Sequence, residues 1–160
     1  MVALREEFER MGLSTVRTYI NSGNVIFSTD MAGRAKIGKL IEESLATAFG
    51  YKTRVLIRSK KEIENTIKHF PKVFDDPKWK HNVIFLSDKI NPPALIDKYT
   101  LRPGIEENSY FDGVWYWSAS LDSGTRAIMY KLSQQPEYQE TTVRSIGTLK
   151  KILDLMNEME

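Results

Sequence analysis

Residues 109–118 are SYFDGVWYWS, two short runs of β-forming residues on either side of Asp112-Gly113. The Asp-Gly dipeptide favours the two-residue turn of a β-hairpin, since both of its residues tolerate a positive φ. Alternation along the second strand puts Trp115 and Trp117 on one face, and Val114, Tyr116 and Ser118 on the other. This hairpin predicts that the second half of the chain is built around an antiparallel sheet.

The segments around the hairpin complete a β-α-β-β-α-β order. Pro92-Pro93 suit a first helical turn, and Ser145 is a typical N-cap for the final helix. The sequence therefore predicts, besides the hairpin, strands over residues 82–86 and 141–144, helices from residue 92 and around 127–132, and a closing helix after residue 145. This order is that of the ferredoxin-like, or split βαβ, unit.

The first half follows the same order but lacks its first element. Apolar residues at helical spacing predict a helix at Leu4, Phe8 and Met11 and another over residues 37–48. Asn21-Ser22-Gly23 predicts a tight turn with a positive φ at Gly23, between strands at residues 15–20 and 24–28. A short β-branched run predicts a third strand over residues 53–57.

We therefore predict an α+β protein of two ferredoxin-like (βαββαβ) units with a linking helix and a C-terminal helix. The first unit covers residues 1–59 and is truncated, residues 60–80 form a linking helix (61–73) and loop, and the second unit with the C-terminal helix covers 81–160. The absent opening strand would be central in its sheet. We expect that this strand is encoded upstream of Met1, or that another element or another subunit takes its place. Because a second copy of the chain could supply the strand, a homo-oligomer is one of the alternatives.

Residues 16–27, VRTYINSGNVIF, resemble the signature hairpin of a bacterial family known as domain of unknown function 1697. Residues 142–145 and 148–153 are similar to the closing strand and last helix of that family, with Ile146 where its pattern usually has tryptophan. Family members typically begin with a strand and a glycine-rich loop, whereas this sequence starts at the helix. The resemblance implies an architecture and no established activity. Within the signature hairpin, Asn21, Ser22 and Asn24 are candidate binding residues.

Composition excludes several kinds of chemistry. The chain of 160 residues has no cysteine and two histidines, so it has no disulfide, thiolate metal site or cysteine nucleophile. The net charge is +2; residues 1–80 carry 15 basic and 10 acidic side chains, and residues 81–160 carry 8 and 11. No apolar run is long enough to span a bilayer. We expect a soluble cytoplasmic protein with no membrane contact, no metal and no cofactor.

Residues 33–40, GRAKIGKL, have the spacing of a phosphate-binding P-loop as far as Lys39. The motif then needs a serine or threonine to hold magnesium, and Leu40 has no hydroxyl. Ile37 and Leu40 lie on one helical stripe, which places both glycines near the first turns of a helix. We therefore expect no nucleotide binding here, and expect Gly33 to be less constrained than Gly23.

His81 is the candidate catalytic residue, as a general base beside Asp75 or Asp76. Imidazole is the side chain whose charge changes near neutral pH, and a carboxylate would orient it. His69 has no second histidine at a metal-binding spacing. A histidine at a strand boundary more commonly has a structural role, so the catalytic role of His81 is an alternative hypothesis.

The aromatic hairpin offers a second alternative. RNA-binding modules of this topology stack bases on exposed aromatic residues, and Trp115 and Trp117 would be the platform here. Residues 81–160 are net negative, which disfavours phosphate binding, and so large an apolar face is usually covered. We expect both tryptophans to pack in the core.

We favour a non-enzymatic domain that binds a ligand or a partner in the cleft between its two units. A small-molecule hydrolase or transferase that uses His81 stays open, as does a single-stranded nucleic-acid-binding protein that uses the aromatic hairpin.

Overall fold

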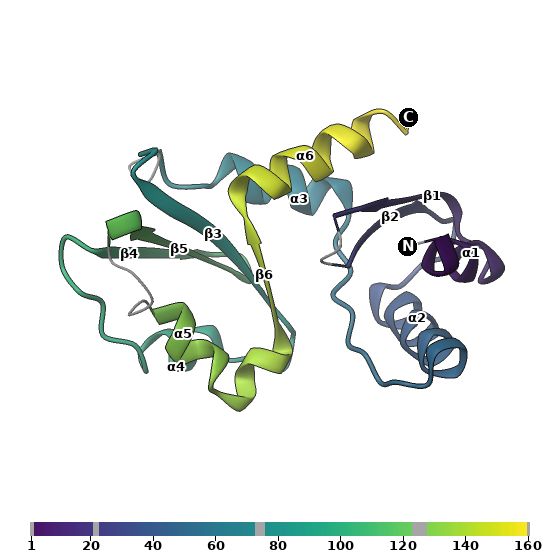
Figure 1. Ribbon diagram of the computed structural model, residues 1–160, viewed down its shortest axis with the longest axis horizontal. Coiled ribbons are helices and arrows are strands. Elements are labelled where there is room, and N and C mark those ends of the chain that lie inside the picture. Colours follow the sequence, from purple (N-terminus) through teal and green to yellow (C-terminus); the bar gives the residue numbers. More distant parts are fainter. Residues whose placement is uncertain (1, 21–22, 73–75, 123–127, 160) are drawn as a thin grey trace. The chain divides into compact units, whose positions relative to one another are not determined.

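The computed structural model describes residues 2–20, 23–72, 76–122 and 128–159 (Figure 1). The protein is α+β, with two antiparallel sheets and helices. Two compact units are formed, one by Met1–Lys60 with Lys151–Glu160 and the other by Lys61–Lys150. They are called unit 1 and unit 2 below, and each is described by itself. The division into domains at 1–59, 60–80 and 81–160 stays a prediction.

Unit 1 contains two helices and a two-stranded hairpin. Its elements are α1 (Val2–Arg10), β1 (Ser14–Tyr19), β2 (Asn24–Ser28) and α2 (Arg34–Phe49). The strands pair antiparallel, as the turn residues predicted. The apolar stripes of α1 and α2 meet the hairpin in one core, whose buried members are Phe8, Leu13, Val16, Ile37, Ile41 and Leu45.

Gly23 and Gly33, the glycines before β2 and before α2, both have a positive φ. Gly23 has a φ of +78°, as predicted for the hairpin turn. Gly33 was expected to be less constrained, but it precedes α2 with a φ of +94°, a conformation that side chains with a Cβ rarely adopt. Gly38 lies inside α2, so the residues of the P-loop-like motif form a helix cap and helix and not a phosphate-binding loop.

The strand predicted over residues 53–57 is wrong, since the structure gives these described residues no strand. The backbone N–H of Val55 donates instead to Glu42 Oε1 of α2 at 2.9 Å. Val55 and Ile57 pack against the core of unit 1. The β-forming residues of this segment thus pack against α2 and its core in place of pairing with another strand.

Gly38→Ala is expected to raise the free energy of unfolding by about 0.5–1 kcal/mol, because alanine is the better helix former. A Cβ at this position would meet Val55 and Ile57 at 3.8 and 3.9 Å, which are ordinary contact distances. Urea denaturation measures the change. A loss of stability would contradict the described packing of residues 55–57 on α2.

Unit 2 contains a four-stranded antiparallel sheet in the order β4-β5-β3-β6. Its strands are β3 (Trp79–Leu86), β4 (Glu106–Phe111), β5 (Val114–Ser120) and β6 (Thr141–Ser145). Its helices are α3 (Lys60–Lys68), α4 (Pro92–Ile96), α5 (Ile128–Ser133) and the 3-10 helix η3 (Pro136–Glu140). The first residue of α3, Lys60, still belongs to unit 1. Asp112 and Gly113 both have a positive φ, as the hairpin turn predicted. The linking helix was predicted to reach residue 73, but it ends at Lys68 because Pro71 disfavours helical backbone at Phe70.

Helices cover both faces of this sheet (Figure 1). Leu95 of α4 and Leu132 of α5 pack on the face that carries Trp115 and Trp117. On the opposite face, Tyr116 Oη donates to the carbonyl of Thr66 in α3 at 2.8 Å. Strand β3, one of the two central strands, is accordingly buried from Asn82 to Leu86. No helix in the described part of the chain is long and apolar enough to cross a membrane.

The final helix, α6 (Ile146–Asn157), begins at the predicted cap. Ser145 Oγ accepts the backbone N–H of Thr148 at 3.1 Å. Residues as far as Lys150 belong to unit 2, and those from Lys151 belong to unit 1. In unit 1, Glu158 pairs with Arg17 of β1 at 2.8 Å.

Candidate functional site

His81 lies at the start of β3 with both ring nitrogens engaged by the protein. Nε2 donates to the backbone carbonyl of Asp76 at 2.8 Å, because a carbonyl can only accept. In the neutral ring, Nδ1 therefore accepts the hydroxyl proton of Ser118 at 2.8 Å. The pair has the spacing of a nucleophile and its base.

The two residues of this pair differ in burial, since His81 is half-buried. Ser118 is fully buried, and the ring of Phe70 meets His81 edge-on at 5.6 Å. Asp76 contributes its carbonyl to His81, while its carboxylate accepts from the backbone N–H of Lys78 at 2.9 Å. Asp75 lies outside the described residues. The geometry ties the segment before β3 to the sheet and offers the Ser118 hydroxyl to no substrate.

Tyr116 lies beside this pair on the same face of the sheet. Its ring meets Phe70 at 5.9 Å, and its hydroxyl donates to Thr66. Burial raises the pKa of Tyr116 to about 12. The phenol is therefore neutral at physiological pH and acts as a hydrogen-bond donor within the core.

Trp115 and Trp117 lie in the core on the α4–α5 face, 0% and 2% exposed. Tyr99 packs its ring 5.7 Å from that of Trp115, and burial raises the pKa of Tyr99. Neither indole N–H has a hydrogen-bond partner among the residues that the structure describes, and the same holds for Asn82 Nδ2 and Tyr99 Oη. An arrangement so enclosed presents no surface on which a base could stack.

The candidate residues of the first hairpin lie at its turn. Asn24 is buried, and its side-chain Nδ2 donates to the carbonyl of Tyr19 at 3.0 Å. This bond links the two strand ends across the turn. Asn21 and Ser22 lie outside the described residues.

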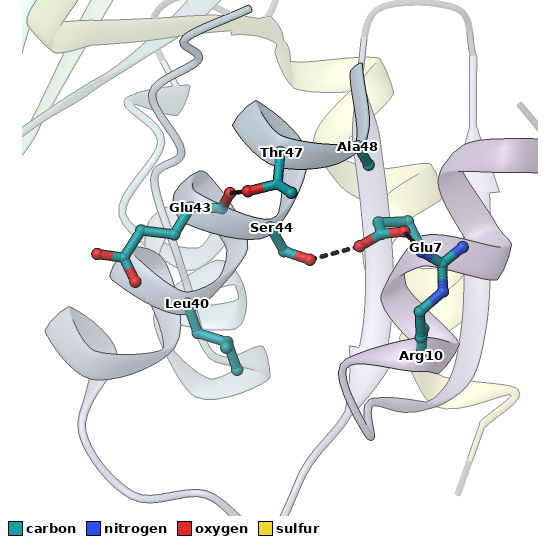
Figure 2. A pocket seen from close by; sticks show the side chains of 7 residues that line it. All are labelled: Glu7, Arg10, Leu40, Glu43, Ser44, Thr47 and Ala48. Atoms are coloured by element: carbon teal, nitrogen blue, oxygen red, sulfur yellow. Dashed lines mark hydrogen bonds and ion pairs between the residues drawn. The ribbon is translucent and has the colours of Figure 1, made fainter. Parts of the chain in front are cut away.

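A pocket of about 320 Å³ lies between α1 and α2 of unit 1 (Figure 2). Its lining was not predicted from the sequence and consists of Glu7, Arg10, Leu40, Glu43, Ser44, Thr47 and Ala48. The polar groups that meet across the pocket come from both helices, while Leu40 and Ala48 supply apolar wall. A pocket of this size is at the lower end of the range for small-molecule sites.

Glu7 is the centre of the polar cluster. It is 4% exposed, although carboxylates are rarely buried unless they are paired. Ser44 Oγ donates to Glu7 Oε1 at 2.5 Å, and Arg10 forms an ion pair with Glu7, with Nη1 2.7 Å from Oε2. Figure 2 shows Glu7 and Ser44 pointing toward one another between the two helices.

The sequence contains a pattern that indicates an inward-facing Glu7, although Glu7 was not among the predicted site residues. Leu4, Phe8 and Met11 define the inner face of the first helix, and Glu7 completes their i, i+3, i+4, i+7 pattern. A carboxylate at a core position needs a partner from a neighbouring element or its own helix. Arg10, three residues on, is one such partner.

The described residues contain no group of three or more histidine, aspartate or glutamate side chains that could hold a metal ion. Glu7, the buried carboxylate of the pocket, is instead paired with a guanidinium and a hydroxyl. The chemistry of this site is that of hydrogen bonding and ion pairing.

Comparisons with known proteins place the chain in a family. The structure is similar to that of the conserved bacterial protein SP0830 from Streptococcus pneumoniae, with a TM-score of 0.84 and 22% identity over 98% of this chain and 88% of that one. At this identity the likeness shows the fold alone. No curated protein matches the chain. The family described as "Protein of unknown function (DUF1697)" matches residues 1–116, which confirms the resemblance seen in the hairpin at residues 16–27. The chain belongs to this family.

Proposed function

We propose that the protein is a non-enzymatic binding domain that takes a small ligand in the α1–α2 pocket of unit 1. The observation that carries the proposal is Glu7, a charged side chain held almost out of solvent beside a pocket of ligand size. Burying a charge costs free energy that pairing only partly offsets. Such a cluster needs a reason beyond stability, and recognition of a ligand supplies one.

The proposal moves the site from a cleft between the units to a pocket inside one of them. Both walls of the pocket come from helices that share one core, so its shape is set before a ligand arrives. Binding to a preformed site avoids the cost of ordering loops.

Binding is favoured over catalysis by the state of His81. Its Nδ1 already accepts from a fully buried serine hydroxyl, and its Nε2 already donates to a carbonyl. A general base must reach the proton it removes from a substrate. Among the described residues that line the α1–α2 pocket there is no histidine that could serve instead.

We also propose that unit 2 has the ferredoxin-like topology that was predicted for both units, whereas the described residues of unit 1 form only two strands. Support comes from unit 2, where the first and third strands of the β-α-β-β-α-β order are neighbours in the middle of the sheet. In this arrangement unit 1 carries the binding function and unit 2 has a filled, two-sided core.

The ligand site is tested by filling it. Ala48→Tyr puts a large side chain into the pocket wall, and Ala35→Tyr makes the same change elsewhere on α2 as a matched control. In a thermal-shift screen of small polar molecules, we expect hits that raise the Tm of the wild type and of Ala35→Tyr but not of Ala48→Tyr. Hits that still stabilise Ala48→Tyr, or no hit at all, would contradict the proposal.

A further inference from the structure

The donors of the α1–α2 pocket are almost all committed to the protein itself. Ser44 gives its single hydroxyl proton to Glu7, and Thr47 gives its proton to the carbonyl of Glu43 at 3.0 Å. Figure 2 shows the carboxylate of Glu43 directed away from α1. Of the described lining side chains, Arg10 alone keeps N–H groups to offer, because a guanidinium has five of them and only its Nη1 is paired, with Glu7.

Exposure separates the two charges of the cluster. The side chain of Arg10 is 71% exposed, and that of Glu7 is 6% exposed. A ligand in the pocket can therefore reach the guanidinium, while the carboxylate is covered. Because one oxygen of Glu7 accepts the Ser44 hydroxyl and the other forms the ion pair with Arg10, Glu7 acts as a positioning residue that holds Arg10 at the pocket.

Two residues of the lining are suited to contact with hydrocarbon. Leu40 and Ala48 stand on the α2 wall, and they present no hydrogen-bonding side-chain atom. A planar guanidinium matches the two oxygens of a carboxylate, with two parallel N–H···O bonds. A head group of this kind joined to a short alkyl tail would satisfy the open donors and the apolar wall together.

We propose that the α1–α2 pocket binds a small carboxylate with an apolar tail, whose carboxylate is held by Arg10. This inference rests on the proposed function, since it names the ligand class of the same site. Glu7 and Ser44 hold the guanidinium in place, and Leu40 and Ala48 contact the tail.

Three probes of equal chain length test the ligand class: n-butyrate, n-butanol and n-butylammonium, each titrated and followed by saturation-transfer NMR. We expect butyrate to bind the wild type with a dissociation constant in the millimolar range, as so small a ligand allows. Butanol and butylammonium should bind at least about tenfold more weakly, since they lack the charge-assisted bonds to Arg10.

Arginine variants on one helix test the assignment of the head group. Arg10→Gln should weaken butyrate binding about tenfold or more, and Arg10→Lys should weaken it less, since a lysine keeps the charge and loses the fork. Arg5→Gln is the matched control, because Arg5 pairs with Glu9 on α1 and does not line the pocket. Its affinity for butyrate should equal that of the wild type.

The outcomes separate this inference from the proposed function. Equal binding of butyrate to Arg10→Gln and the wild type, or stronger binding of butylammonium or butanol, would overturn the carboxylate assignment. If Ala48→Tyr still blocks the probe that binds best, the pocket remains the ligand site. Butyrate that binds Ala48→Tyr as well as the wild type would overturn both.

Discussion

Trp117→Ala is expected to lower the free energy of unfolding by about 3–5 kcal/mol, because it opens a large cavity in a closed core. Trp117 is 2% exposed and packs with residues of β3, α4 and α5. Urea denaturation measures the loss. Leu121→Ala is a control in the same unit, since Leu121 is 61% exposed, and it should cost less than about 1 kcal/mol.

The same tryptophans test whether the protein binds single-stranded nucleic acid through this hairpin. In a Trp79→Phe background, which leaves Trp115 and Trp117 as the emitters, we expect blue-shifted fluorescence that single-stranded oligonucleotides do not change. A base-stacking platform would give quenching that weakens steeply as salt rises. That result, together with a stable Trp117→Ala variant, would refute the described core of unit 2.

Tyr116 should make the protein unstable at high pH. Its pKa is raised by burial from about 10 in the unfolded chain to about 12 in the folded one, so folding favours the neutral phenol. A raised pKa contributes stability that is present below pH 10 and is lost as the pH rises toward 12. The loss amounts to about 2 kcal/mol by pH 12.

Tyr116→Phe isolates this effect from the titration of lysines. At pH 8 the variant should be about 1 kcal/mol less stable than the wild type, because the carbonyl of Thr66 loses its bond from the tyrosine hydroxyl. Between pH 10 and 12 the wild type should lose more stability, so that the two curves converge and cross. Parallel curves over this range would show that the phenol is not buried.

Local sequence signals predicted most of the fold. Asp112-Gly113 predicted the β4–β5 hairpin, the turn at Gly23 predicted the first hairpin, and Ser145 predicted the start of α6. These features depend on a few adjacent residues. The predicted strand over 53–57 failed because a strand needs a partner, and the side chain of Glu42 bonds the N–H of Val55 instead.

The candidate site was harder to predict for the same reason. The pocket joins Glu7 to Ser44, which are far apart in the sequence, and no local pattern reports that two helices will bring them together. The sequence indicated His81 only as an alternative, catalytic candidate, because imidazole has distinctive chemistry. It could not show that the hydroxyl beside it, on Ser118, would be fully buried.

Amide chemical-shift mapping tests the central claim most directly. An isotope-labelled sample of the full chain is mixed with the polar molecules that raise its Tm, and the shifted residues are identified. We predict that the largest shifts occur at residues 7–10 of α1 and 40–48 of α2, and that the Ala48→Tyr variant shows none of them. Shifts centred on His81 and Ser118 in β3 and β5, or the same shifts in Ala48→Tyr, would contradict a binding site between α1 and α2.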